Sequence, residues 1–185
     1  MENNNLILRT FKIDPGHSNI GFKVKHMMFA KVNGRFEKHS AQIKFTDENF
    51  ENAQLEFSAQ TDSINTNNKE RDEHLRSADF FNAATYHTIK YHSSKITRKN
   101  NKEYIVEGYL KMNGIKNFLQ LQAEFSGILK DPAGQNRLGL ILTGSIDRLN
   151  WNMKWNRPLE SGGILVSKEV QLIIETEFLE EQNQN

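Results

Sequence analysis

Histidine side chains are the residues of this sequence best suited to acid–base or metal chemistry. The six histidines are His17, His26, His39, His74, His87 and His92. They are scattered, and none forms the His-Glu-x-x-His spacing that places two ligands on one face of a helix. A scattered histidine more often makes a hydrogen bond or lies at the surface. We therefore expect no metal site and no cofactor.

Nucleophilic catalysis has equally little support in the residue pattern. The serines lack the Gly-x-Ser-x-Gly turn that exposes a nucleophile, and the absence of cysteine excludes thiolate chemistry and disulfides. The charged run at residues 70–74 is the densest acid–base cluster, but such a run on a short helix is usually a solvated face with local ion pairs. We expect no catalytic residue and predict a binding protein that is not an enzyme.

Composition narrows the partners and the compartment. Lys and Arg total 24 against 23 for Asp and Glu, so no excess of positive charge is available to hold a nucleic acid. The longest apolar runs, such as residues 138–142, are far shorter than the ~20 residues of a membrane-spanning helix. Residues 6–8 are too short for the apolar centre of a secretory signal. We expect a cytoplasmic protein, or a periplasmic one if a leader has been removed.

Alternating apolar and polar residues indicate which elements must position any site. This period-two pattern occurs at residues 20–25, 55–58, 106–112, 119–125 and 170–176. Each such strand has one apolar and one polar face, which predicts an all-β antiparallel barrel of about eight strands closed around the apolar side. Residues 67–77 instead predict one short helix, because helix formers follow two Asn residues that could cap it. Phe80 and Phe81 could anchor this helix across a barrel end.

The interior of such a barrel decides between two kinds of function. About eight strands make a barrel wide enough either to fill with side chains or to hold one small ligand. Periodicity alone favours neither a filled core nor a cavity.

Four sequence blocks resemble a known family in their order and content. They are residues 13–26 with 32–36, residues 63–66 with 71–81, residues 108–116, and residues 146–148 with Trp151. These blocks resemble the signatures of the YceI-like family and extend over roughly residues 11–178. We accordingly expect an N-terminal extension at residues 1–10, a YceI-like lipid-binding barrel at 11–178 and a polar tail at 179–185.

The resemblance implies a lipocalin-like antiparallel barrel with a helix near one end. Its apolar lumen would hold an amphiphilic long-chain lipid of the polyisoprenoid or isoprenoid quinone type, with fatty-acyl lipids as other plausible cargo. A protein of this kind would act as a carrier or storage protein. Burying each CH₂ of a lipid tail contributes ~0.8 kcal/mol, so such a lumen could bind a long tail without polar contacts.

Two sets of residues follow from this expectation. The lumen candidates are the inward apolar residues Ile20, Phe22, Val24, Phe36, Ile43, Phe45, Leu55, Phe57, Ile89, Tyr91, Leu110, Leu121, Phe125, Leu140, Leu142 and Ile174. The rim candidates for a lipid head group are His17, Asn19, His26, Arg35, Arg71, His74 and Trp155. These rim residues can donate hydrogen bonds to a phosphate or carbonyl.

Two other functions are compatible with the same sequence. One is an enzyme that acts on a bound lipid with a histidine as general base. The other is a filled barrel that serves as an interaction module through its outer surface. Homodimerisation is a further expectation, because a second copy can cover an exposed edge strand.

Overall fold

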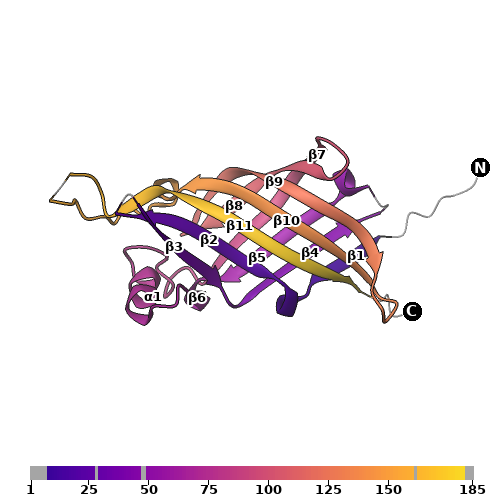
Figure 1. Cartoon of the computed structure of the whole chain (residues 1–185), viewed down its shortest axis with the longest axis horizontal. Coiled ribbons are helices and arrows are strands. Elements are labelled where there is room, and N and C mark those ends of the chain that lie inside the picture. The colour runs from indigo at the N-terminus through magenta and orange to yellow at the C-terminus, as the bar shows by residue number, and fades with distance from the viewer. Residues whose placement is uncertain (1–7, 28, 47–48, 161, 182–185) are drawn as a thin grey trace, which may run out of the picture.

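The computed structural model describes residues 8–27, 29–46, 49–160 and 162–181 (Figure 1). The strands are β1 (Arg9–Ile13), β2 (Asn19–His26), β3 (Ala30–Phe36), β4 (His39–Phe45), β5 (Gln54–Gln60), β6 (Ile64–Asn65), β7 (Thr88–Arg98), β8 (Glu103–Met112), β9 (Ile115–Lys130), β10 (Asn136–Asp147) and β11 (Val166–Glu180). The helices are α1 (Lys69–Arg76) and the 3-10 turns η1 (Pro15–His17), η2 (Phe50–Asn52), η3 (Thr61–Ser63) and η4 (Arg148–Trp151). None of these helices is long and apolar enough to cross a membrane.

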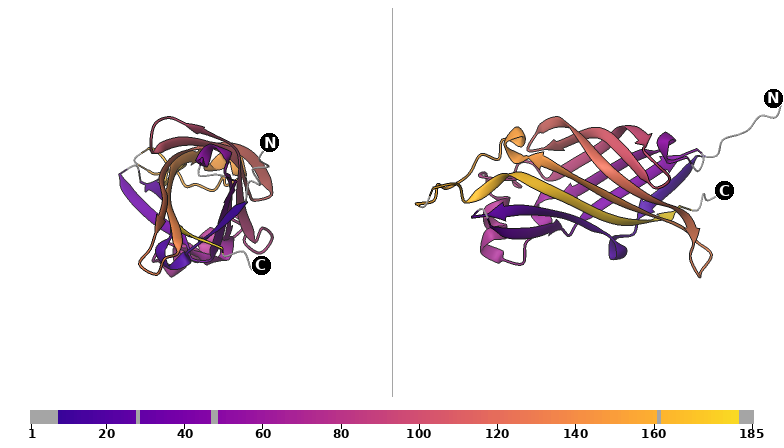
Figure 2. Two further views of the ribbon diagram at one scale, coloured as in Figure 1. Left: turned by 90° about the vertical axis from the view of Figure 1, so that its right-hand side faces the viewer. Right: turned by 45° about the horizontal axis from the view of Figure 1, so that its top comes forward.

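Eight antiparallel strands close into a barrel in the described part of the chain. Their order is β1-β4-β5-β7-β8-β9-β10-β11, and β11 pairs back onto β1. Figure 2 shows the closed ring end-on. This confirms the predicted all-β barrel with one short α-helix, and α1 lies within the residues expected to be helical. In Figure 1, α1 lies at one end of the barrel and both chain termini lie at the other. We call these the helix end and the termini end.

The alternation in sequence becomes the alternation of buried and solvent-facing side chains. In β8, every second residue from Tyr104 to Met112 is buried. The facing strand β9 does the same from Leu119 to Phe125, with Val106 opposite Leu121. Successive side chains of a strand point to opposite faces, so one apolar face per strand is enough to build the interior.

Strand β11 pairs with two different strands along one edge. Residues Val166 to Glu175 pair with β2, whereas Phe178 to Glu180 pair with β1. The turn at η1 separates β1 from β2, and the Asp14 carboxylate accepts a hydrogen bond from the Gly16 N–H at 3.1 Å. Strand β3 then pairs with β2, and the short β6 pairs with β3. The helix end therefore carries three strands beyond the closed ring.

Aromatic side chains fill the termini end. The rings of Phe11 and Phe45 stack with centroids 5.3 Å apart. Phe50 of η2 is 1% exposed and stacks on Phe125 at 4.5 Å, with Tyr104 edge-on at 5.0 Å. These contacts close this end of the barrel from inside, because packed aromatic rings leave little free volume.

Hydrogen bonds to the chain segment before it hold α1 in place. The Asn68 side chain caps its first turn by accepting from the Arg71 N–H at 2.9 Å. The buried Asp72 carboxylate accepts from the Thr66 hydroxyl and N–H, and the Arg71 guanidinium donates to Thr66. Arg76 donates to the carbonyl oxygen of Ile64 at 3.1 Å. The helix is thus fixed to β6 and through it to β3.

Ion pairs reinforce the short β1–β11 seam at the termini end. Arg9 donates to Glu180 at 2.6 Å, and Arg137 contacts Asp14 at 3.0 Å and Asp131 at 2.8 Å. Hydrogen bonds from His17 and Arg137 lower the pKa of Asp14, and the hydrogen bond from Arg9 lowers the pKa of Glu180. The Arg137 hydrogen bond also lowers the pKa of Asp131.

These lowered pKa values predict acid-sensitive stability. A carboxylate whose pKa is lower in the folded state stabilises the fold above its unfolded pKa of about 4, and this contribution is lost as the pH falls through the folded pKa. We expect the free energy of unfolding to fall on acidification below about pH 5, and to fall less in Arg137→Gln, which loses two of these contacts. Urea unfolding across pH 3–7 measures the slopes, with Lys102→Gln as the control. Equal slopes in all three proteins would contradict the prediction.

Candidate functional site

An apolar cavity of about 150 Å³ lies inside the half of the barrel that faces α1. Strands β2, β3, β5, β7, β8, β9, β10 and β11 supply its walls, and the segments around α1 and η4 cover it. Its lining residues are Ile20, Gly21, Phe22, Val24, Phe36, Phe57, Ser58, Ala59, Leu75, Phe80, Phe81, Ile89, Tyr91, Leu110, Met112, Leu119, Leu121, Ile146, Arg148, Met153, Val166, Val170, Leu172 and Ile174. With so few polar residues in the lining, this cavity suits an apolar occupant.

The β2–β11 pair shows how strand register builds the wall. Phe22 lies directly opposite Leu172, and Ile20 lies opposite Ile174. Inward residues of paired strands face each other across the ladder, so the two strands present one continuous apolar surface.

Two glycines make room for aromatic rings in this wall. A Cβ on Gly34 would lie 2.3 Å from the Phe22 ring, and a Cβ on Gly108 would lie 2.8 Å from the Tyr91 ring. Both rings therefore lie close to the backbone of a neighbouring strand. The buried Tyr91 hydroxyl donates to the Val106 carbonyl at 3.3 Å, and burial raises the pKa of this phenol, so Tyr91 adds no charge to the cavity.

Phenylalanines after α1 cover the cavity at the helix end. Phe81 contacts Phe36 edge-on with ring centroids 5.5 Å apart, and its N–H donates to the Leu75 carbonyl at 3.0 Å. Phe80 lies between the cavity and the rings of His74 and Trp155, at 5.1 and 5.5 Å respectively. Phe80 and Phe81, the residues expected to anchor the helix, thus also cover the cavity.

Arg148 is the buried charged residue of the cavity wall. It is 4% exposed, and its guanidinium donates to the carbonyls of Met153, Ser167 at 3.0 Å and Val166 at 3.3 Å. The guanidinium carbon also lies 5.9 Å from the centre of the Phe80 ring. Burial lowers the pKa of Arg148. Through these bonds Arg148 ties η4 and the following segment to the start of β11.

The lumen candidates divide into two groups by height along the barrel. Ten line the cavity, namely Ile20, Phe22, Val24, Phe36, Phe57, Ile89, Tyr91, Leu110, Leu121 and Ile174. Six lie outside its lining: Ile43, Phe45, Leu55, Phe125, Leu140 and Leu142. These six are buried in the packed core, because the aromatic rings of the termini end fill the space that they face.

The rim candidates do not form one cluster, and all seven lie outside the cavity lining. His74 and Trp155 are brought together, with ring centroids 4.6 Å apart, and His74 Nε2 lies 2.8 Å from Asp79. His17 lies instead beside Asp14 at the η1 turn. The other four have separate positions, with Arg71 bonded to Thr66, Arg35 paired with Glu37, and Asn19 and His26 at opposite ends of β2.

Some residues that line the cavity are not among the lumen candidates from the sequence. Met112, Val170 and Leu172 continue alternating patterns that were visible in the sequence. Arg148, Met153 and Val166 come from turns and strand ends, where no periodicity marks an inward side chain. Their position follows from the Arg148 hydrogen bonds, which no local pattern signals.

One group of side chains has the composition of a metal site. Ligand atoms of Asp14, His17 and Glu177 all lie within 4.8 Å of one another. The Arg137 guanidinium contacts Asp14 at 3.0 Å and Glu177 at 3.4 Å. The two carboxylates thus already share an ion-pair partner in Arg137, so we assign this group to the barrel seam.

The family model of the YceI-like domain matches residues 11–178. This chain belongs to the YceI-like family. A UPF0312 protein of Staphylococcus aureus (strain N315) is 34% identical over 172 residues, which cover 92% of this chain and 98% of that relative. A YCEI protein of Campylobacter jejuni has a similar crystal structure, with 29% identity, a TM-score of 0.75 and coverage of 98% of this chain and 100% of that one.

A second similar structure is a polyisoprenoid binding domain from Saccharophagus degradans. It has 14% sequence identity and a TM-score of 0.67, and the match covers 91% of this chain and 97% of that one. At this identity, the similarity is one of fold.

The aromatic packing at the termini end predicts that a substitution there lowers stability without changing the cavity. We expect Phe45→Ala to destabilise the protein by about 3–5 kcal/mol, because it removes a buried ring stacked on Phe11. The control Phe118→Ala, at a side chain that is 54% exposed, should cost far less. Urea unfolding measures both. Similar losses in the two variants would show that the termini end is not tightly packed.

The hydrogen bonds of the Arg148 guanidinium predict that its replacement also destabilises the protein. Arg148→Met removes the guanidinium donor from the carbonyls of Met153, Ser167 and Val166, of which Val166 keeps the Asn156 side chain as a donor. We therefore expect a loss of at least about 2 kcal/mol. Arg148→Lys should recover only part of it, because one ammonium cannot span acceptors that a planar guanidinium reaches together. Unfolding followed by tryptophan fluorescence measures the effect, and Arg157→Met provides an exposed control in the same segment. A stability of Arg148→Met equal to that of the control would refute the prediction.

Proposed function

We propose that this protein binds the apolar tail of an amphiphilic long-chain lipid inside the barrel and acts as a carrier or storage protein. The observation that carries the proposal is the cavity between Phe22 of β2, Leu121 of β9 and the phenylalanine cover, whose lining is almost wholly apolar. Removing a lipid tail from water into such a lining contributes ~0.8 kcal/mol per CH₂.

The size of the cavity sets a condition on loading. Its 150 Å³ is below the ~300 Å³ at which ligand pockets usually begin. A long tail therefore fits only when lining side chains move. The cover formed by Phe80 and Phe81 and the Phe22 ring over Gly34 are the groups whose displacement enlarges the space with least change to the strand ladders.

The class of lipid is supported by the similar structures. The Saccharophagus degradans domain is a polyisoprenoid binding domain, and its fold matches 91% of this chain. We propose a polyisoprenoid or isoprenoid quinone as cargo, with fatty-acyl lipids as the alternative. An almost wholly apolar cavity distinguishes these by length and shape more than by hydrogen bonds.

Extraction after native purification identifies the cargo class. Organic solvent extraction followed by mass spectrometry should yield an isoprenoid lipid in a stoichiometric amount. A fatty-acyl lipid would retain the carrier function and change the cargo. An empty extract, together with no binding of apolar dyes, would reject lipid binding in favour of a filled barrel that acts through its surface.

A charge in the cavity wall should weaken uptake strongly. We expect Phe22→Glu to weaken binding of a fluorescent polyene fatty acid by at least about tenfold, because the carboxylate must be buried among apolar groups. The matched control is Phe118→Glu, which introduces the same charge on the outer face of β9. Fluorescence titration of folded protein, checked by circular dichroism, measures the affinity. Unchanged uptake by a folded Phe22→Glu would place the tail elsewhere.

A second candidate function is an enzyme that acts on the bound lipid. It rests on His74, whose Nε2 donates to the Asp79 carboxylate at 2.8 Å beside the Phe80 cover, which leaves Nδ1 as the nitrogen for a general base. Turnover across a broad lipid panel that is lost in His74→Ala would support it. Lack of turnover by the wild-type protein would count against it.

A further inference from the structure

The β2–β3 hairpin tip exposes apolar side chains at the helix end. Phe29 is 81% exposed and Met27 is 39% exposed. The Met27 N–H donates to the Leu165 carbonyl at 2.8 Å, which joins this tip to the segment before β11, where Ile164 is 44% exposed. Exposed large apolar residues held together in this way usually mark a surface that contacts another molecule. We call Met27, Phe29 and Ile164 the apolar tip.

Lysines surround the apolar tip on the outer face of β2 and β3. Lys25 and Lys31 lie directly opposite each other in the strand pair. Like charges in this position destabilise a sheet, so the pair has no structural benefit. Among the described residues, none of the ion pairs includes Lys23, Lys25 or Lys31.

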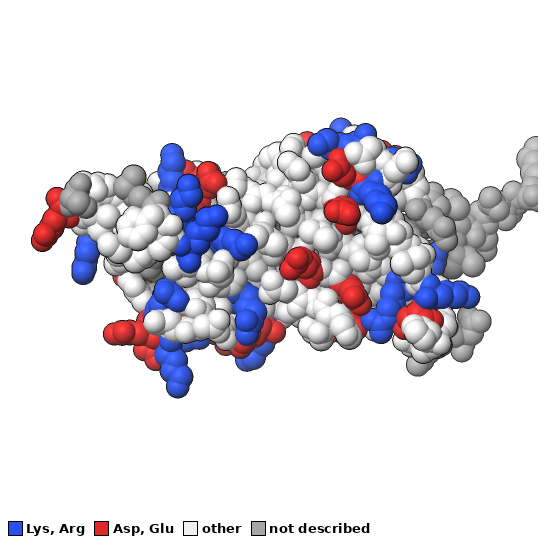
Figure 3. Space-filling model, in the orientation of Figure 1, with Lys and Arg blue, Asp and Glu red and all other residues white. Residues whose placement is uncertain are grey.

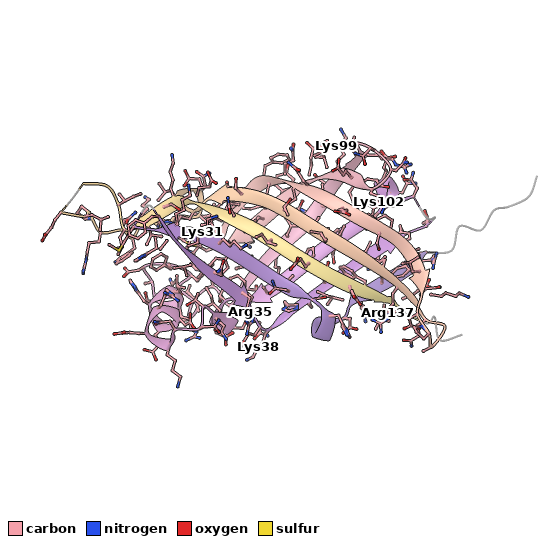
Figure 4. All side chains as sticks on the ribbon, viewed as in Figure 1. Lys31, Arg35, Lys38, Lys99, Lys102 and Arg137 are labelled. Atoms are coloured by element: carbon pink, nitrogen blue, oxygen red, sulfur yellow. The ribbon has the colours of Figure 1, made fainter. Side chains whose placement is uncertain are left out.

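The same lysines border a surface hollow of about 310 Å³. Lys23, Lys25, Lys31 and Lys168 line it together with Ile164. Glu169 also lines it, and Lys168 lies 3.9 Å from Asp147, so these two carboxylates offset two of the four positive charges and leave a local excess of two. Figure 3 shows basic side chains gathered over this part of the surface, and Figure 4 places Lys31 within it. We call these four lysines the lysine collar.

We propose that the apolar tip and the lysine collar dock the protein onto an anionic lipid bilayer. Phe29 and Met27 would enter the boundary between head groups and acyl chains, while the collar contacts lipid phosphates. Apolar side chains beside lysines are the combination that binds membrane interfaces, since burial and charge attraction add. The whole chain has a net charge of only +1, so the attraction to anionic lipids comes from the lysine collar. Salt screens the attraction between exposed charges, so we expect binding to depend strongly on salt.

The docking surface lies beside the cavity. Val24 lies between Lys23 and Lys25 on β2 and lines the cavity, as does Val166 at the start of β11. A protein docked at the apolar tip therefore holds its cavity next to the membrane surface. Transfer of cargo at this surface rests on the lipid-binding function proposed above, whereas docking itself does not.

Vesicle sedimentation tests the docking. Full-length protein is mixed with phosphatidylcholine vesicles that contain no anionic lipid or about one third phosphatidylglycerol. We expect binding to the anionic vesicles only, falling as salt is raised. Equal binding to both vesicles, or no binding to either, would overturn the proposal; the second result would assign the surface to another partner, such as an acidic protein.

Matched variants test whether binding depends on this surface or only on the total charge and exposed apolar area of the protein. Lys25→Gln with Lys31→Gln should weaken vesicle binding by about fivefold per lysine, and Phe29→Ser by about tenfold. The control Lys99→Gln with Lys102→Gln removes the same charge near the termini end, as Figure 4 shows, and Phe118→Ser removes an exposed ring from β9. If the controls weaken binding as much as the surface variants, the proposal fails.

Fatty-acid uptake distinguishes this proposal from the proposed function. Uptake of the fluorescent polyene fatty acid added from ethanol needs no vesicle, so the surface variants should retain it and their thermal stability. Loss of vesicle binding with retained uptake supports docking. Vesicle binding without any uptake by the wild-type protein would reject the carrier function and leave docking standing.

Discussion

The pairing of β11 with two different strands is the constraint on which the rest of this structure depends. Along one edge β11 pairs first with β2 and then with β1. Three residue pairs and the ion pairs of Arg9 and Arg137 close the ring at the termini end. At the helix end, β2 and β3 occupy that edge, and the segment with α1 covers the interior. The change of partner divides the barrel into a packed half and a half with a cavity.

This division separates the packed core from the proposed binding site. The packed half concentrates rings such as Phe11, Phe45 and Phe50, whose close contacts leave no room for a ligand. The other half contains the Phe80 and Phe81 cover and the Phe22 ring beside Gly34, which are the groups that we propose to move when a lipid tail enters. Arg148 connects η4 and the following segment to the start of β11 with hydrogen bonds to backbone carbonyls, so a buried charge organises an otherwise apolar site.

The net charge of +1 gives no indication that charge is distributed unevenly along the barrel. The termini end uses its arginines in ion pairs with Asp14, Asp131 and Glu180. The β2–β3 face keeps the ammonium groups of Lys25 and Lys31 side by side without such partners among the described residues. A local accumulation of one charge beside exposed apolar side chains is costly for an isolated protein and useful for one that meets an anionic surface. The cavity and this face share strand β2.

By itself, the sequence determined the fold class, the helix and the direction of most side chains. Period-two alternation specifies which face of a strand turns inward, and Asn68 marks the helix start, because both signals are local. The position of a residue along the barrel axis, in contrast, is not marked by any local sequence signal. Leu121 and Leu140 have the same inward pattern, yet Leu121 lines the cavity and Leu140 is packed in the core. Only the tertiary structure decided this, since free space depends on which distant rings, such as Phe50, reach the same level of the interior.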